Sequence, residues 1–249
     1  HSDHRRQRQM CIRDRLWIDN EFSNIYRRKG ATGFNAATSK DYTYYMVSLP
    51  SVAFELWAWM ESDRILNPVF RQFYKEREVV QEERQSRTDD NPGGKLYEAL
   101  LSTAYWSHPY RLPTIGWPSD LKKLTATQVK EFYKTYYRPD NMTLVLVGDL
   151  ELEEIKPQLE RYFSRIPKAS GRIPKVITKE PKQKGVREAV IEHDSEPAFM
   201  LAFHKKIYPN KDDAHFAVLH SVLGDGRSSI LYKELVQEKK LASSVYTTE

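Results

Sequence analysis

Two glutamates, Glu76 and Glu83, lie seven residues apart in a charged segment, residues 70–84, whose pattern predicts a helix. Together with three apolar residues they form one face of this helix, which consists of Val69, Phe73, Glu76, Val80 and Glu83. Residues at this spacing lie on one side of a helix, whereas Glu78 and Glu82 fall on other sides. A carboxylate on a core-facing stripe is costly unless something pairs with it, and a metal ion or an activated water would be such a partner. The alternative is a stripe that ends early, with both carboxylates at a solvated rim.

The histidines do not complete an obvious metal site. A zinc peptidase needs three protein ligands, an open position for water and a carboxylate that takes the water's proton. Neither His-Glu-x-x-His nor His-x-x-Glu-His occurs in the sequence. His193 precedes Glu196 by three residues but lacks the second histidine, and His215 and His220 are five apart, which does not place them on one helix face. His108, before a proline, is interpreted as a structural loop residue.

The charge of the chain is unevenly distributed. The total is +5, of which residues 1–15 carry +3 and residues 166–187 carry +6, so the remaining chain carries −4. The basic character therefore belongs to a tail and a linker and not to the folded body. This distribution argues against a nucleic-acid-binding surface on the body.

The remaining composition indicates a globular protein without disulfides. Apolar residues make up 40% of the sequence and Cys11 is its only cysteine, which excludes disulfide stapling and leaves the compartment open. No apolar run reaches membrane-spanning length. Residues 1–15 have neither a helical nor a strand period, and they are interpreted as an artefact or a disordered basic arm.

The order of the predicted elements favours an α+β fold, with helices packed on one face of a mostly antiparallel sheet. Helices are predicted at 16–28, 52–67, 70–84, 95–106, 125–137, 151–166, 212–223 and 228–240. Strands are predicted at 41–49, 142–147, 188–192, 198–204 and 241–248. The segment 167–187 is rich in Pro and Lys and poor in aromatic residues, as is typical of a linker. Thr125 and Gln128 form a capping box at a helix start.

Several motifs, in order along the chain, carry a resemblance to a known family. They are Gly33-x-Asn35-Ala36-x-Thr38-Ser39-x-Asp41-x-Thr43-x-Tyr45, Glu61-Ser-Asp-Arg64, Glu76-Arg-Glu-Val-Val-Gln-Glu-Glu83, Ser107-His-Pro-Tyr110, Ile115-Gly116, Tyr137-Arg-Pro-Asp-Asn141, Val147-Gly-Asp149, Leu223-Gly-Asp-Gly-Arg-Ser-Ser and Lys240-Leu-Ala. Together they resemble the insulinase/pitrilysin family of zinc metallopeptidases, over roughly residues 17–249. Such a succession is far more specific than any single motif.

The resemblance implies roles for five residues and one cofactor. Glu83 resembles the third ligand of the family's single zinc ion, and Glu76 resembles the acidic residue that supports the site. A divalent cation would compensate the buried carboxylate pair. Asn35, Ala36 and Ala37 resemble the edge strand that holds an extended peptide substrate by backbone hydrogen bonds.

The sequence departs from the family in one respect. The family's His-x-x-Glu-His motif supplies two ligands and the general base, and counting back from Glu83 leads into the suspect tail or before residue 1. The resemblance therefore implies a fragment: a catalytic-type first repeat at 16–166, the linker, and the start of a second repeat at 188–249. It also implies a second peptidase-type half or subunit that closes a chamber around the peptide.

Three functions follow as alternatives. The first is a zinc metalloendopeptidase of which this chain is an incomplete part. The second is a catalytically inactive family member that binds or supports an active partner. The third is a protein-interaction domain unrelated to peptidases.

Overall fold

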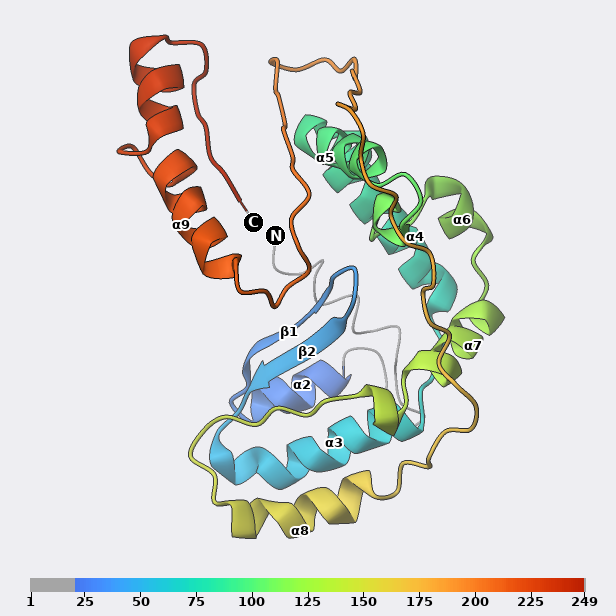
Figure 1. Ribbon diagram of the computed structural model, residues 1–249. Helices are drawn as coiled ribbons and strands as arrows, with labels where there is room; N and C mark the ends of the chain where they lie inside the picture. Colours follow the sequence, from blue (N-terminus) through green and yellow to red (C-terminus); the bar gives the residue numbers. More distant parts are fainter. Residues whose placement is uncertain (1–20, 249) are drawn as a thin grey trace. The chain divides into compact units, whose positions relative to one another are not determined.

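The chain is described by a computed structural model over residues 21–248, which form two units, residues 21–201 and 202–248 (Figure 1). In the first unit the α-helices are α2 Glu21–Arg28, α3 Phe54–Leu66, α4 Phe73–Arg84, α5 Pro92–Ala104, α6 Pro118–Lys123, α7 Ala126–Tyr136 and α8 Leu152–Phe163. Short helical turns are η2 Ser51–Ala53, η3 Gln85–Asp89, η4 Pro109–Arg111 and η5 Pro139–Asn141.

The sheet of the described residues consists of two antiparallel strands, β1 Thr32–Thr38 and β2 Thr43–Ser48. The register pairs Ala36 with Tyr45 and has an irregularity between Thr32 and Asn35. Figure 1 shows α2 and α3 on one side of this hairpin. The ring centroids of Tyr26 and Phe34 are 5.3 Å apart, which joins α2 to β1. The α+β class is confirmed, with helices far outnumbering the strands.

Helix α3 is a continuous helix because it contains neither Gly nor Pro, and it ends before Pro68, whose ring disfavours helical backbone in the preceding residue. Its outer side packs on α8, where the ring centroids of Trp57 and Phe163 are 5.9 Å apart. At the solvated margin of this contact, Glu55 accepts hydrogen bonds from Arg161 at 3.2 Å and from Tyr162 at 2.8 Å.

Helix α7 begins with the capping box that the sequence predicts, and helix α5 begins with a cap that was not predicted. The capping box of Thr125 and Gln128 is confirmed at the start of α7. Helix α5 begins at Pro92, three residues before the predicted start, because Asn91 caps it: its Oδ1 accepts a hydrogen bond from the Gly94 N–H at 2.9 Å. The six-residue helix α6 was not predicted, since it lies in a proline-bearing stretch too short to show a helical period.

Four of the predicted strands are wrong. Residues 142–147, 188–192, 198–204 and 241–248 are assigned to no strand, although parts of them are extended and apolar. A strand requires a hydrogen-bonded neighbour, and within residues 21–248 the only ladder is the one between β1 and β2. Most apolar side chains of the first of these segments are also exposed, and Val147 is 92% exposed.

The second unit contains helix α9, Asp213–Gly224, and a π-helical turn, η6 Tyr232–Glu238, where a longer helix was predicted. The chain end packs back on α9: the hydroxyl of Thr247 donates to the carbonyl oxygen of His220 at 3.0 Å. Thr247 lies so close to Gly224 that a Cβ there would meet it at 2.6 Å. The close approach therefore requires glycine.

The predictions for residues 1–15, and for the part of the first helix before Glu21, lie outside the described residues. The boundary of the two units falls between residues 201 and 202, whereas the second repeat was predicted to start at residue 188. The division into repeats stays a prediction.

Candidate functional site

Helix α4 carries both candidate glutamates on its buried face. Glu76 is 5% exposed and Glu83 is 8% exposed, and Phe73 is buried on the same side. Glu78 and Glu82, in contrast, are on the exposed or partly exposed sides. Seven residues amount to about two turns, or a rise of about 10 Å along the axis, so the two carboxylates lie one above the other on one face. Of the predicted stripe, Phe73, Glu76 and Glu83 are buried, whereas Val80 is partly exposed and Val69 lies before the helix begins. The alternative of a solvated rim does not describe the two glutamates.

Glu83 has an ion-pair partner on the next turn of the helix. Its Oε1 lies 2.7 Å from Nη1 of Arg87, whose side chain is about half exposed. The buried carboxylate is thus neutralised by a guanidinium that reaches in from solvent. An ion pair of this kind can be exchanged for another cation, because the guanidinium can return to water when the carboxylate takes a different partner.

The described residues do not make up a complete zinc site. Between residues 21 and 248, no group of three or more His, Cys, Asp or Glu side chains is close enough together to hold a metal ion. A catalytic zinc ion needs three protein ligands. A complete donor set is therefore not present among residues 21–248, and the assignment of Glu83 as a zinc ligand stays a prediction.

The candidate peptide-binding residues lie on β1. Ala36 is buried, whereas Asn35 and Ala37 are half-buried. The Ala36 N–H donates to Oδ1 of Asn35 at 2.9 Å. Because β1 pairs with β2 along one side only within the described chain, its other side is the place where an added strand would bond.

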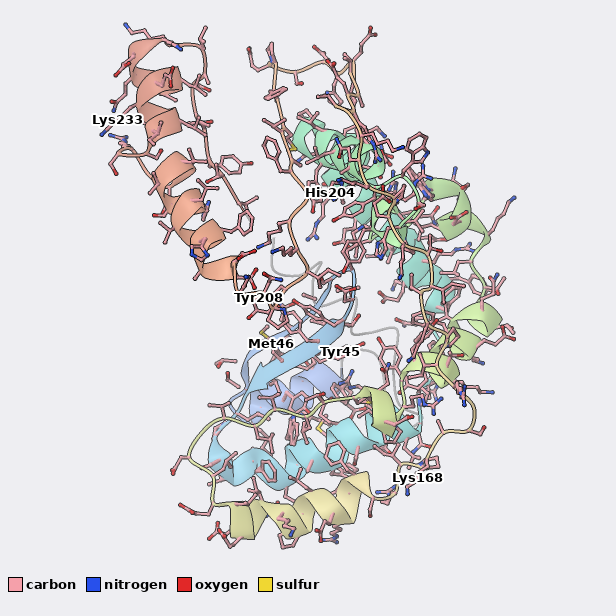
Figure 2. All side chains as sticks on the ribbon, in the orientation of Figure 1. Tyr45, Met46, Lys168, His204, Tyr208 and Lys233 are labelled. Atoms are coloured by element: carbon pink, nitrogen blue, oxygen red, sulfur yellow. The ribbon has the colours of Figure 1, made fainter. Side chains whose placement is uncertain are left out.

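A buried polar network supports the hairpin from behind. The hydroxyl of Tyr26 donates to Glu61 at 2.8 Å, Nε of Arg64 donates to Glu61 at 2.9 Å, and the guanidinium of Arg64 lies 4.3 Å from the centre of the Tyr45 ring. The hydroxyls of Tyr45 and Tyr137 are 2.9 Å apart. Through Tyr45 this network fixes β2 to α2, to α3 and to the residue that follows α7. Tyr45 and Met46, both labelled in Figure 2, are neighbours on the strand and project to its opposite faces.

Burial governs the proton affinities in this network. Burial raises the pKa of Tyr26, and the neighbouring charge of Glu61 raises it further. Burial also raises the pKa of Tyr45, assisted by the nearby Tyr137. For Arg64 burial alone would lower the pKa, but the charge of Glu61 holds it above its ordinary value. Arg64 therefore stays cationic and both tyrosines stay neutral across the physiological range.

The turn of the hairpin is held by the loop after α5. The hydroxyl of Tyr110 donates to Asp41, and the ammonium of Lys40 donates to the carbonyl oxygen of Leu112. The hydrogen bond to Asp41 raises the pKa of Tyr110 to about 12. Burial lowers the pKa of Lys40. The hairpin is thus held at its turn as well as behind its strands.

His108 serves this loop and is not placed as a ligand. Its Nδ1 accepts a hydrogen bond from the Tyr110 N–H at 3.3 Å, and its ring lies 4.5 Å from that of Tyr110, edge to face. The structural interpretation made from the sequence is confirmed.

Arg84 was not singled out by the sequence, although it is 2% exposed and lies beside Glu83. Its Nη1 donates to Glu98 on α5 and to the carbonyl oxygen of Gly116, both at 2.8 Å. Arg84 therefore fixes the end of α4, and with it the orientation of the two glutamates, against α5 and the loop before α6. A single buried arginine produces no periodic pattern in the sequence. Its position directly after Glu83 was the one signal that could have indicated its role.

The comparison with protein families agrees with this architecture. Residues 123–248 match the family described as the Peptidase M16 inactive domain. The chain therefore belongs to the M16 peptidase family, and the family resemblance drawn from the motifs is confirmed. The interpretation as an unrelated protein-interaction domain is excluded.

Among the proteins similar to this chain is the zinc protease PqqE of Helicobacter pylori, which is 36% identical over 234 residues, covering 91% of this chain and 52% of that protein. A crystal structure of a protease from Helicobacter pylori matches 98% of this chain and 61% of its own length, with 29% identity and a TM-score of 0.88. The peptidase M16 inactive domain from Pseudomonas fluorescens has the same fold, with 18% identity over 97% of this chain and 59% of that one, and a TM-score of 0.74.

The chain thus spans about half the length of its curated relatives. Among the described residues, no helix is long and apolar enough to cross a membrane.

Proposed function

We propose that this chain is part of a zinc-dependent metalloendopeptidase, to which it contributes one carboxylate ligand, Glu83, a supporting carboxylate, Glu76, and the peptide-binding strand β1. The observation that carries the proposal is the burial of both carboxylates on one face of α4 in a member of a peptidase family. The similarity to proteins described as zinc proteases supports zinc as the metal.

Zinc, when held by a complete donor set of which Glu83 is one member, would supply Lewis-acid chemistry for the hydrolysis of a peptide bond. The task of Glu83 is to supply an anionic oxygen, for which the guanidinium of Arg87 must give way. The task of Glu76 is to add negative charge on the helix face that carries the ligand, about two turns away from it. The remaining ligands and the general base would come from residues outside the described range.

The peptide would be held as an added strand beside Asn35, Ala36 and Ala37. Backbone hydrogen bonds to a strand edge are independent of side-chain identity, so this mode suits substrates that share an extended backbone and not a sequence. The Ala36 N–H, which donates to the side chain of Asn35, would exchange this bond for one to the peptide.

The test compares glutamine variants in the complete protein that carries this chain. Glu83→Gln should lose zinc and turnover together, because a neutral amide is a poor zinc ligand. Glu76→Gln should keep most of the zinc and lose turnover by about 10- to 100-fold, as is typical of groups that support a ligand. Glu82→Gln, which changes the same charge one residue away on the exposed side, is the matched control and should change neither zinc content nor kcat.

Zinc content by atomic absorption and kcat on a quenched fluorescent peptide are the two measurements. Full zinc and full activity in Glu83→Gln would show that the ligand assignment is wrong and would make Glu82 the next candidate. The 249-residue chain alone should release zinc on dialysis against a weak chelator, since its described residues do not complete the donor set.

A second function is favoured by one finding, namely that the matched family description is that of an inactive domain. In this alternative the protein binds a peptide or supports an active partner and performs no hydrolysis. The complete protein would then bind an extended peptide with no turnover, and Glu83→Gln would leave that binding unchanged.

A further inference from the structure

The segment that follows α8 is bound to the first unit along part of its length. It begins near Lys168, labelled in Figure 2, and in Figure 1 it runs as an extended trace that reaches the end of α5. Residues 166–187 contain seven basic side chains and one acidic side chain, Glu180. The contacts with α5 and the loop after it centre on one acidic and one basic side chain, Glu180 and Arg187, so the binding is specific and not a general attraction of the basic charges.

Glu180 accepts hydrogen bonds from three successive backbone N–H groups after α5. The distances are 2.8 Å from Trp106, 2.9 Å from Ser107 and 3.1 Å from His108. Burial alone would raise the pKa of Glu180, but these N–H donors and Arg187 lower it to about 2. A carboxylate that accepts several backbone N–H groups is strongly favoured in its ionised form. Glu180 therefore stays charged at any physiological pH.

Arg187 closes the attachment from the other side. Its Nη1 lies 3.2 Å from Glu180 and donates to the carbonyl oxygens of Thr103 at 3.2 Å and Ala104 at 2.9 Å. These carbonyls belong to the last turn of α5, where a cation is favoured. The guanidinium also lies 5.1 Å from the Trp106 ring centre. One ion pair thus joins the segment to a helix end and to the loop that follows it.

The same loop holds the turn of the β1–β2 hairpin. His108, whose N–H donates to Glu180, accepts the Tyr110 N–H and packs on its ring. Tyr110 in turn donates to Asp41 at the hairpin turn. Four residues therefore form a continuous path of direct contacts from the segment to the hairpin.

We propose that Glu180 is a positioning residue for the β1–β2 hairpin, acting through the loop at residues 106–110 and the hydrogen bond between Tyr110 and Asp41. Its consequence for peptide binding rests on the proposed function of β1. The segment after α8 is then part of the support of the peptide-binding strand. Any displacement of the segment at Glu180 would loosen the turn of the hairpin.

The primary test is amide hydrogen exchange of the full 249-residue chain, read separately for the loop at 104–112, the hairpin turn at 38–43 and helix α3. Glu180→Ala should raise exchange several-fold in the loop and also in the turn, and leave α3 unchanged. Tyr110→Phe should raise exchange in the turn and not in the loop contacts of Glu180. The double variant should show the same turn exchange as the more affected single variant, because both changes interrupt one path.

The matched control is Lys182→Ala, which alters an exposed charge of the same segment. It should change exchange in neither region. If Glu180→Ala frees the loop but leaves exchange at 38–43 as in the parent chain, the coupling is absent and the proposal is overturned. A turn that loosens equally in Lys182→Ala would also overturn it, because the effect would then come from the charge of the segment.

Peptide binding is measured separately, with a fluorescent alanine-rich peptide long enough to span β1 and the same peptide with methylated backbone nitrogens. Strand addition requires the backbone N–H groups, so only the first peptide should bind, and it should bind several-fold more weakly to Glu180→Ala. Equal binding of both peptides would contradict the proposed role of β1. The exchange result alone decides the positioning role of Glu180.

Discussion

The guanidinium of Arg64 lies 4.3 Å from the centre of the Tyr45 ring, so a charge on α3 supports the middle of strand β2. Glu61 and Arg64 form an ion pair that is almost wholly buried. Removing one partner of such a pair leaves the other charge buried without compensation.

Arg64→Ala should therefore lower the free energy of unfolding by about 3–5 kcal/mol, the range for one member of a buried pair. Urea denaturation with linear extrapolation measures it. Arg161→Ala is the control, because Arg161 pairs with Glu55 on the surface and is 71% exposed; its cost should stay below about 1 kcal/mol. Equal costs for the two variants would mean that the Arg64 network does not stabilise the hairpin.

The pair of hydroxyls on Tyr45 and Tyr137 should show coupling. Either single change to Phe leaves one hydroxyl without this hydrogen bond and should cost about 0.5–1.5 kcal/mol. The double change removes both hydroxyls and should cost less than the sum of the single changes. A double-mutant cycle by urea denaturation measures the difference, and strict additivity would contradict a direct bond.

Glu180 should contribute to the loss of stability in acid. Its pKa in the folded chain is about 2, below the ordinary value of 4.5, so its stabilisation is fully present above about pH 4.5 and is lost as the pH falls toward 2. Glu180→Gln should therefore differ from the parent chain most at neutral pH, and the difference should shrink through this window. Urea midpoints measured across the acid range test this, with Glu188→Gln, an exposed carboxyl farther along the chain, as the control.

Gly116 should resist substitution. Its φ is +90° and its carbonyl oxygen accepts the hydrogen bond from Arg84. Gly116→Ala forces an L side chain into the left-handed region and should cost about 1–2 kcal/mol. Gly185→Ala, at a position with nothing within 4 Å of the new Cβ, should change stability by less than about 0.5 kcal/mol. Thermal unfolding of the two variants compares them directly.

The features of the fold that were predicted correctly depend on interactions between residues near each other in the sequence. The buried face of α4 followed from the spacing of Phe73, Glu76 and Glu83, and the start of α7 followed from Thr125, because both depend on neighbours within one or two turns. The strand at 142–147 was predicted wrongly because its nearly continuous run of apolar residues reports a preference for extended backbone. A strand exists only where another segment supplies the ladder.

The support of the candidate site was largely missed for the same reason. The contact between Arg84 and Glu98 spans 14 residues, and that between Glu180 and Trp106 spans 74. Composition alone described residues 167–187 as a linker. The available signal was Glu180, the single acidic residue among seven basic ones, because it is the one charged side chain of the segment that can accept hydrogen bonds.

The extended residues 142–147 have a consequence for handling this chain in isolation. Their backbone N–H and carbonyl groups have no ladder partner within residues 21–248, and Leu144, Val145 and Val147 expose apolar surface beside them. An unpaired apolar edge is a template for edge-to-edge pairing between molecules. The purified chain should accordingly become turbid as its concentration rises. Val145→Lys should raise the concentration at which turbidity begins, and it changes no candidate site residue.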